Sequence, residues 1–161
     1  MTLDPPVGVA PTWSPLQEEC ISFSATEELG IYDLRFWIYH FFMDKTEMKN
    51  RTKQFALRVM TMTDHLPSNS KANVIKNQIL RSATSVGANY RAALRGRSSA
   101  EFIAKLGTVL EEADETAFWL ELIEESNLMS AEKLVSLKSE ADEICAIIFS
   151  TRRSTRENDK S

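Results

Sequence analysis

Ten lysine and arginine residues lie between residues 49 and 97, and they are the side chains of this sequence best suited to binding chemistry. Arg91 and Arg95 are four residues apart, so on a helix they share one face. Guanidinium groups spaced in this way can contact successive phosphates, and the release of counterions makes such contacts sensitive to salt. The residues that we predict to bind nucleic acid are Lys53, Arg58, Lys76, Arg81, Arg91, Arg95 and Arg97.

The charges of the chain are separated into blocks, which gives these basic residues a second interpretation. Residues 48–110 carry a net charge of +9 and residues 111–151 a net charge of −9, while the whole chain carries −4. Blocks of opposite sign favour self-association or a charged partner. The arginines can equally pair with the acidic second half, within one bundle or across a subunit interface. The sequence leaves both interpretations open.

Two aromatic side chains are candidates for an oligomer interface. Trp119 is expected between the buried and the solvent-facing sides of its helix, where a large aromatic side chain can anchor a partner subunit. Tyr90 lies among the basic residues, and we assign it to the same predicted interface. Its alternatives are stacking on a base and ordinary packing between helices.

The residue types that most catalytic and metal sites require are missing. The acidic cluster at residues 111–115 contains a Glu-x-x-Glu pattern, but di-iron bundles need Glu-x-x-His from two helices. His40 and His65 are the two histidines of the chain. No glycine-rich phosphate loop, Cys–His pair or Ser–His–Asp set is apparent. We therefore predict that the protein is not an enzyme and uses no metal and no cofactor.

The helical pattern from Ser98 to Asn127 is the element around which these groups must be positioned. Its apolar or small residues alternate in steps of four and three, as in a helix of a left-handed bundle. Ser98 and Glu101 form a capping box, and Asn127 suits the left-handed residue that ends a helix. The predicted buried line is Phe102, Leu106, Val109, Ala113, Thr116, Leu120 and Ile123.

Three further helical patterns accompany this element. Pro67 ends the first, Ser70 caps the second, and Gly87 within the second is expected where another helix leaves no room for a side chain. Short connections force neighbouring helices to be antiparallel, so we predict an all-α protein: an antiparallel up-down-up-down four-helix bundle over residues 48–152. Residues 153–161 lack an apolar pattern and are predicted to be a disordered tail. The three patterns cover residues 49–66, 71–95 and 130–151.

Residues 1–47 follow no helical pattern, and four of the five prolines lie within the first 15 residues. The apolar segment Ile31–Met43 is shorter than the roughly 20 residues needed to cross a membrane, and no secretory signal precedes it. We hypothesise that translation starts near Met48 and that residues 1–47 are an upstream extension. A genuine arm that docks on the bundle, or an aromatic membrane anchor, is the alternative. Two cysteines without a disulfide framework favour a reduced, cytoplasmic setting.

The segments LRSATSVGANYRAA (residues 80–93) and SSAEFIAKLGTVLEEADETAFWLELI (residues 98–123) resemble the four-helix-bundle family of 23S rRNA intervening-sequence proteins. The resemblance covers residues 48–152 and implies a bacterial protein that forms a toroidal homopentamer. Ala92 departs from the family pattern, which often has a carboxylate there. A distant branch is the accessory variability protein of diversity-generating retroelements, which implies nucleic acid and a reverse transcriptase as partners. That branch is more basic than this chain.

These observations predict a non-enzymatic, ring-forming homo-oligomer. In the first hypothesis its first two helices bind structured RNA or DNA. In the alternative hypothesis it is a protein-interaction or assembly module that does not bind nucleic acid. No membrane contact is predicted.

Overall fold

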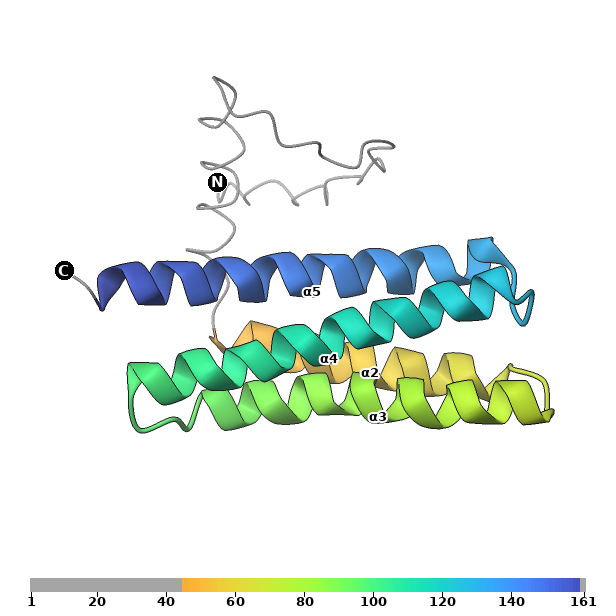
Figure 1. Ribbon diagram of the computed structural model, residues 1–161, viewed down its shortest axis with the longest axis horizontal. Coiled ribbons are helices and arrows are strands. Elements are labelled where there is room, and N and C mark those ends of the chain that lie inside the picture. Colours follow the sequence, from red (N-terminus) through yellow and green to blue (C-terminus); the bar gives the residue numbers. More distant parts are fainter. Residues whose placement is uncertain (1–44, 160–161) are drawn as a thin grey trace, which may run out of the picture.

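The computed structural model describes residues 45–159 as helices joined by short turns. The helices are α2 (Lys45–Asp64), α3 (Ser70–Ala93), α4 (Ser99–Glu125) and α5 (Ala131–Asn158). They run alternately in opposite directions, α3 packs against α2 and α4, and α5 packs against α4 and, less extensively, α2 (Figure 1). Within this part of the chain there is no strand, and the predicted all-α four-helix bundle is confirmed.

The helical part begins slightly before the predicted boundary. Helix α2 starts at Lys45, and Met48 is 3% exposed in the core rather than at a free end. The hypotheses about the segment Ile31–Met43 and about an upstream extension concern residues 1–44, which lie outside the described residues.

Helix α4 buries the line of residues that its spacing predicts. Phe102 is partly buried, and the other six residues of that line are 0% exposed. Thr116 is the polar member of the line, and its hydroxyl lies 2.9 Å from the Ser82 hydroxyl of α3. The same Thr116 oxygen also lies 2.7 Å from the Glu112 carbonyl oxygen, so this buried hydroxyl is hydrogen-bonded.

The predicted signals at the two ends of α4 are present. The Ser98 hydroxyl accepts a hydrogen bond from the Glu101 backbone N–H at 3.2 Å, as in a capping box. The Glu101 carboxylate accepts from the backbone N–H of Arg97 at 2.9 Å, one residue before the amide that a capping box uses. At the other end Asn127 has a φ of 55°, the left-handed conformation predicted for it.

The N-cap of α3 is Asn69 rather than the predicted Ser70. The Asn69 side chain accepts a hydrogen bond from the Ala72 backbone N–H at 2.9 Å, and its own backbone is extended. Ser70 is already the first helical residue, so its hydroxyl cannot take the capping position.

Gly87 lies where α2 and α3 approach closely. A Cβ atom at Gly87 would lie 3.5 Å from the Thr52 carbonyl oxygen of α2, which is ordinary van der Waals contact. The two helices do approach closely here, but the prediction that no side chain has room is wrong, because a methyl group would fit. A larger side chain would meet the α2 backbone, which cannot move aside.

The predicted disordered tail is wrong for residues 153–158, which continue α5 to Asn158. No proline or glycine interrupts this stretch. Arg153 and Glu157 form an i,i+4 ion pair at 3.0 Å, and the Thr155 hydroxyl donates to the Thr151 carbonyl oxygen at 2.8 Å. Because helix continuation needs only local backbone bonds and such pairs, a missing apolar pattern does not end a helix.

Candidate nucleic-acid interface

A hollow of about 540 Å³ lies between α2 and α3, lined by residues of both helices. Four small residues line it, together with three cationic side chains that we predicted to bind nucleic acid. The small residues are Ala56, Thr84, Gly87 and Ala88, and the cations are Lys53, Arg91 and Arg95. The small residues leave room for a backbone phosphate to approach the cations. We call these seven residues, together with Leu57, the α2/α3 groove.

The three cations of the α2/α3 groove keep their charges available. Within residues 45–159, none of the Lys53, Arg91 and Arg95 side chains forms an ion pair. For Arg91 and Arg95 the reason lies in α4, whose first turns face the end of α3 and contain Glu101 as their only acidic residue before Glu111. Positive charge that no carboxylate neutralises can be neutralised by phosphate.

Arg81 occupies a different environment on the same helix. Its guanidinium pairs with Glu115, and with Glu112 at 3.4 Å, both on α4. The hydrogen bond with Glu115 and then its charge raise the pKa of Arg81. Hydrogen bonds from Arg81 and from Trp119 lower the pKa of the Glu115 carboxyl. Burial raises the pKa of Glu112, an effect that Arg81 partly offsets.

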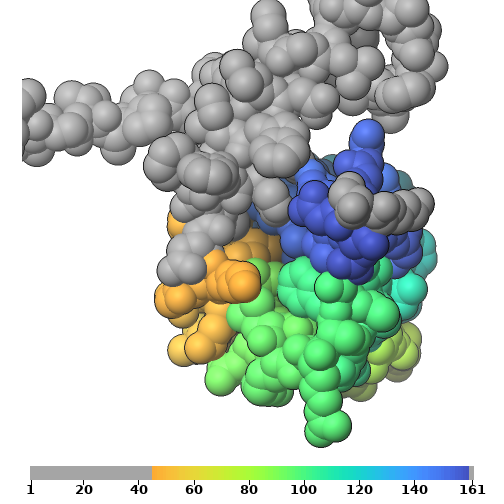
Figure 2. All heavy atoms as spheres, turned by 90° about the vertical axis from the view of Figure 1, so that its left-hand side faces the viewer, coloured from red at the N-terminus to blue at the C-terminus, as the bar shows by residue number. Residues whose placement is uncertain are grey.

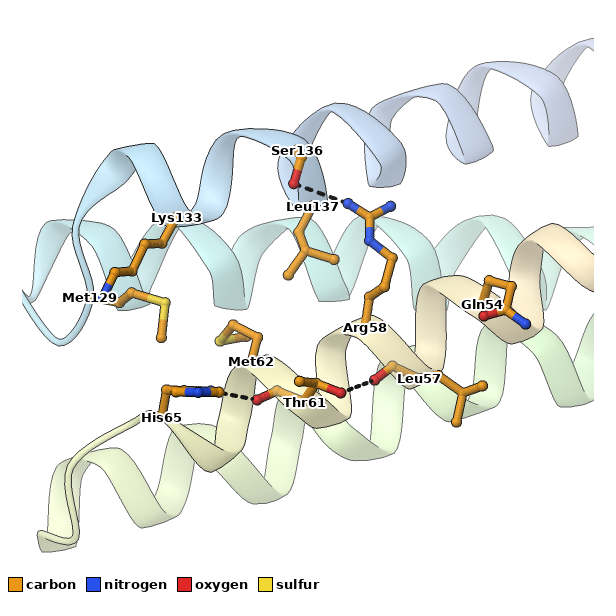
Figure 3. A pocket seen from close by; sticks show the side chains of 10 residues that line it. All are labelled: Gln54, Leu57, Arg58, Thr61, Met62, His65, Met129, Lys133, Ser136 and Leu137. Carbon is orange, nitrogen blue, oxygen red and sulfur yellow. Dashed lines mark hydrogen bonds between the residues drawn. The ribbon is translucent and has the colours of Figure 1, made fainter.

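Arg58 also reaches across to an acidic helix. Its Nη2 donates to the Ser136 hydroxyl at 3.0 Å, and its Nη1 lies 3.7 Å from Glu140. Figure 3 shows this side chain pointing from α2 to α5 beside a second hollow of about 600 Å³, whose lining includes Met62 and Leu137. For Arg58 and Arg81 the structure therefore has the intramolecular pairing that we considered as the alternative.

Arg51 makes the most enclosed of these ion pairs, although it was not among the predicted binding residues. Its Nε lies 2.6 Å from Glu140, its Nη2 pairs with Glu143, and its side chain is 17% exposed. Burial by itself would lower the pKa of Arg51, but the hydrogen bonds and charges of Glu140 and Glu143 outweigh burial and raise it. This pair joins α2 to α5.

The remaining predicted cations, Lys76 and Arg97, lie apart from the groove. The Lys76 ammonium donates to the Leu66 carbonyl oxygen at 3.0 Å, where it satisfies a backbone group just after α2. Arg97 is exposed on the turn between α3 and α4, at the same end of the bundle as Arg91 and Arg95.

The two aromatic residues predicted at an oligomer interface have different environments in the structure. Tyr90 is 7% exposed and belongs to the core of its own bundle, because it follows the buried Val86 by one helical turn. Its assignment to an oligomer interface is thereby corrected. Trp119 is partly buried, and its Nε1 donates to Glu115 at 3.1 Å. Phe118, which the sequence analysis missed, is 49% exposed, and its ring meets Trp119 edge to face with centroids 5.1 Å apart.

Basic residues from three distant stretches of sequence meet at one end of the bundle. Residues 45–53, 91–105 and 152–159 lie together because the helices alternate in direction, and Figure 2 faces this end. These stretches carry 11 basic and 4 acidic residues, whereas the other described residues carry 6 and 12. We call them the basic end. The sequence analysis missed its third contributor, since residues 153–161 were predicted to be disordered.

The acidic cluster at residues 111–115 offers no metal geometry. Among the described residues, no three His, Cys, Asp or Glu side chains are grouped as ligands of a metal ion. Cys145 is partly buried, and burial followed by the charges of Asp114 and Asp142 raises its pKa to about 11, so its thiol is protonated at neutral pH. None of the helices in residues 45–159 is long and apolar enough to span a membrane.

Comparison with known proteins identifies a family and a similar solved structure. Residues 44–150 match the model of the family described as 23S rRNA-intervening sequence protein. The chain is also similar to a crystal structure, at 1.70 Å resolution, of a protein of unknown function from the S23 ribosomal protein family of Bacteroides thetaiotaomicron VPI-5482. The two are 36% identical with a TM-score of 0.64, over 69% of this chain and 99% of the other. No curated protein matches.

Proposed function

The chain belongs to the 23S rRNA-intervening sequence protein family, and we propose that it is a non-enzymatic, self-associating bundle that binds nucleic acid through the α2/α3 groove. The observation that carries this proposal is the set of three cations, Lys53, Arg91 and Arg95, that no carboxylate within residues 45–159 neutralises. The family description names 23S rRNA, so structured RNA is the first ligand to test.

The groove is suited to contact with the phosphate backbone. Its small residues leave the three cations accessible, and most contacts of such cations with nucleic acid are made to phosphate. Arg91 and Arg95 are one helical turn apart, and Lys53 faces them from α2. Binding through such contacts depends strongly on salt and weakly on sequence.

Self-association is the second part of the proposal. Phe118 is 49% exposed on α4 and lies against the partly buried Trp119, and aromatic side chains placed in this way can anchor a subunit interface. The family resemblance suggests a ring of five subunits. A reverse transcriptase partner stays a prediction.

The alternative is an assembly module that does not bind nucleic acid. It is favoured by the ion pairs of Arg51, Arg58 and Arg81, which use three cations of the basic block within one chain. In the first candidate the unpaired cations of the groove contact nucleic acid, and in the second they do not.

A salt titration separates these candidates. We expect the affinity for a fluorescently labelled structured RNA, measured by fluorescence anisotropy, to fall as the salt concentration rises from about 50 to about 200 mM. The double variant Lys53→Ala/Arg91→Ala should reduce the slope of log affinity against log salt by about 2, because each lost phosphate contact removes about 0.9. Absence of binding by the unaltered protein at low salt would leave only the assembly module.

The control removes the same charge from elsewhere in the bundle. Lys71→Ala/Lys133→Ala should leave the slope close to that of the unaltered protein, since these lysines lie outside the groove. Equal losses in both double variants would mean that overall charge, and not the groove, binds RNA. For self-association, Phe118→Asp should lower the subunit number in native mass spectrometry, whereas Val74→Asp, equally polar and at an exposed position on α3, should not.

A further inference from the structure

The last three turns of α5 place one aromatic and three arginine side chains on a single face. Phe149, Arg152, Arg153 and Arg156 follow the spacing i, i+3, i+4 and i+7, which aligns side chains along a helix. With Glu157 they line a hollow of about 250 Å³. This hollow belongs to the basic end, but its residues are separate from those of the α2/α3 groove.

The apolar ring of Phe149 is exposed to solvent and does not belong to the core. Its exposed fraction is 59%, although the neighbouring Ile148 is fully buried. Such a ring, with cations one turn away, offers a flat apolar surface together with positive charge. Nucleic-acid bases stack on aromatic rings of this kind when they are not hidden in a duplex.

The arginines around the ring differ in how firmly they are engaged. Arg156 forms no ion pair with any residue in the described range. Arg153 pairs with Glu157 at 3.0 Å, but both side chains are more than half exposed. A solvent-exposed pair of this type is weak, so a phosphate can compete for the guanidinium.

Arg152 is held in place by α4. Its guanidinium lies over Gly107, where an added Cβ atom would be 3.2 Å from its Nη2. The glycine thus makes room for the arginine. The Arg152 Nε is buried and has no hydrogen-bond partner among the described residues, and no carboxylate there pairs with the group. A positioned, unneutralised cation therefore lines the hollow.

The dipole of α5 explains only part of this arrangement. Cations near the C-terminal end of a helix are favoured by the carbonyl groups there, which accounts for Arg156 in the last turn. The dipole explains neither the exposed ring of Phe149 nor the room that Gly107 leaves for Arg152.

We propose that this face of α5 binds an unpaired nucleotide of a single-stranded nucleic acid, with its base on Phe149 and its phosphate against the arginines. The inference rests on the proposed function in that both require nucleic-acid binding, but it names a second site and a single-stranded ligand. The basic end of the bundle would attract such a strand to both sites.

The test compares an unstructured RNA oligonucleotide with a blunt-ended RNA duplex, which has no unpaired base. We expect Phe149→Ala to weaken binding of the unstructured strand by about 5- to 150-fold, the usual range for one stacked base, and to leave binding of the duplex nearly unaffected. Phe149→Tyr should retain binding because it keeps an aromatic face. Arg156→Ala should reduce the salt slope for the single strand by about 0.7.

Val135→Ala is the matched control, since Val135 is an equally exposed apolar residue of α5 at the other end of the bundle. If Phe149→Ala and Val135→Ala bind the single strand equally well, the nucleotide site does not exist, while the groove proposal stands. A change of subunit number in Phe149→Ala, measured by native mass spectrometry, would assign the ring to a subunit interface and overturn the proposal. If the unaltered protein binds neither RNA, both proposals fail.

Discussion

Arg81 and Arg91 lie on the same helix, ten residues apart, and have opposite environments. Arg81 pairs with Glu112 and Glu115, whereas Arg91 forms no ion pair within residues 45–159. Because α3 and α4 are antiparallel, residues later in α3 face residues earlier in α4, before the acidic run begins at Glu111. The position of a cation along the bundle thus decides whether it can pair with another helix or remains available to a ligand.

The same contrast appears over two residues of α2. Arg51 faces α5 and pairs with Glu140 and Glu143, while Lys53 faces α3 and lines the groove. Residues two positions apart on a helix do not share a face, so one points to an acidic neighbour and the other does not. Substitution of a paired cation such as Arg51 should therefore affect stability, and substitution of an unpaired cation such as Lys53 should affect RNA binding.

The largest effect should come from Arg51→Ala. This change leaves the carboxylate of Glu140, which is 18% exposed, without its closest partner, and should lower the free energy of unfolding by about 2–4 kcal/mol. Lys53→Ala should change it by no more than about 0.5 kcal/mol. Urea denaturation followed by circular dichroism measures both. Similar losses in the two variants would remove the distinction between structural and available cations.

A smaller effect, on RNA affinity, is expected when an acidic side chain is introduced into the groove. Ala88 lines the groove and is exposed, and Ala88→Glu puts a carboxylate one turn before Arg91. We expect RNA affinity to fall by about tenfold through pairing with Arg91 and repulsion of phosphate, with the stability nearly unchanged. Ala146→Glu, at an exposed position on α5, is the control and should bind as the unaltered protein does. Unchanged binding by Ala88→Glu would exclude the groove as the contact surface.

The smallest effect concerns the paired region and its dependence on pH. The pKa of Glu115 is lowered by Arg81 and Trp119, so its contribution to stability is present above the ordinary glutamate pKa and is lost as the pH falls through the lowered value. The difference in unfolding free energy between the unaltered protein and Glu115→Gln should therefore shrink in acid below about pH 4.5.

For the variant Glu112→Gln we expect the opposite change of stability with pH. Burial raises the pKa of Glu112, so protonation of this group favours the folded state as the pH falls through the raised value. Relative to Glu112→Gln, the unaltered protein should gain stability over that range. Denaturation series at several pH values measure both differences, and the same trend in both variants would contradict the assigned pKa directions.

The fold was predictable because its signals are local. The steps of three and four that place Leu106, Val109 and Leu120 in the core follow from the helical repeat alone. The conformation of Asn127 and the cap at Ser98 depend on neighbours within a single turn. The C-terminal turns of α5 were missed because they contact little of the core, so their residues carry no apolar pattern.

The candidate sites depended on contacts between helices, and the sequence could propose them only in part. It indicated the cations Lys53, Arg91 and Arg95, but it grouped them with Arg81, whose partner is 34 residues away in the chain. Tyr90 was misplaced because a slight rotation of a helix decides whether a residue beside the apolar line is buried.

By itself the sequence determined four amphipathic helices, their antiparallel order and the separation of charge into blocks, since each depends on composition and on spacing along the chain. The tertiary structure alone decided which cations meet carboxylates, and it brought residues 152–159 to the end that Arg91 and Arg95 occupy. The physical reason is that ion pairing depends on distances of a few ångströms between helices, which the register of their packing sets and no local pattern encodes.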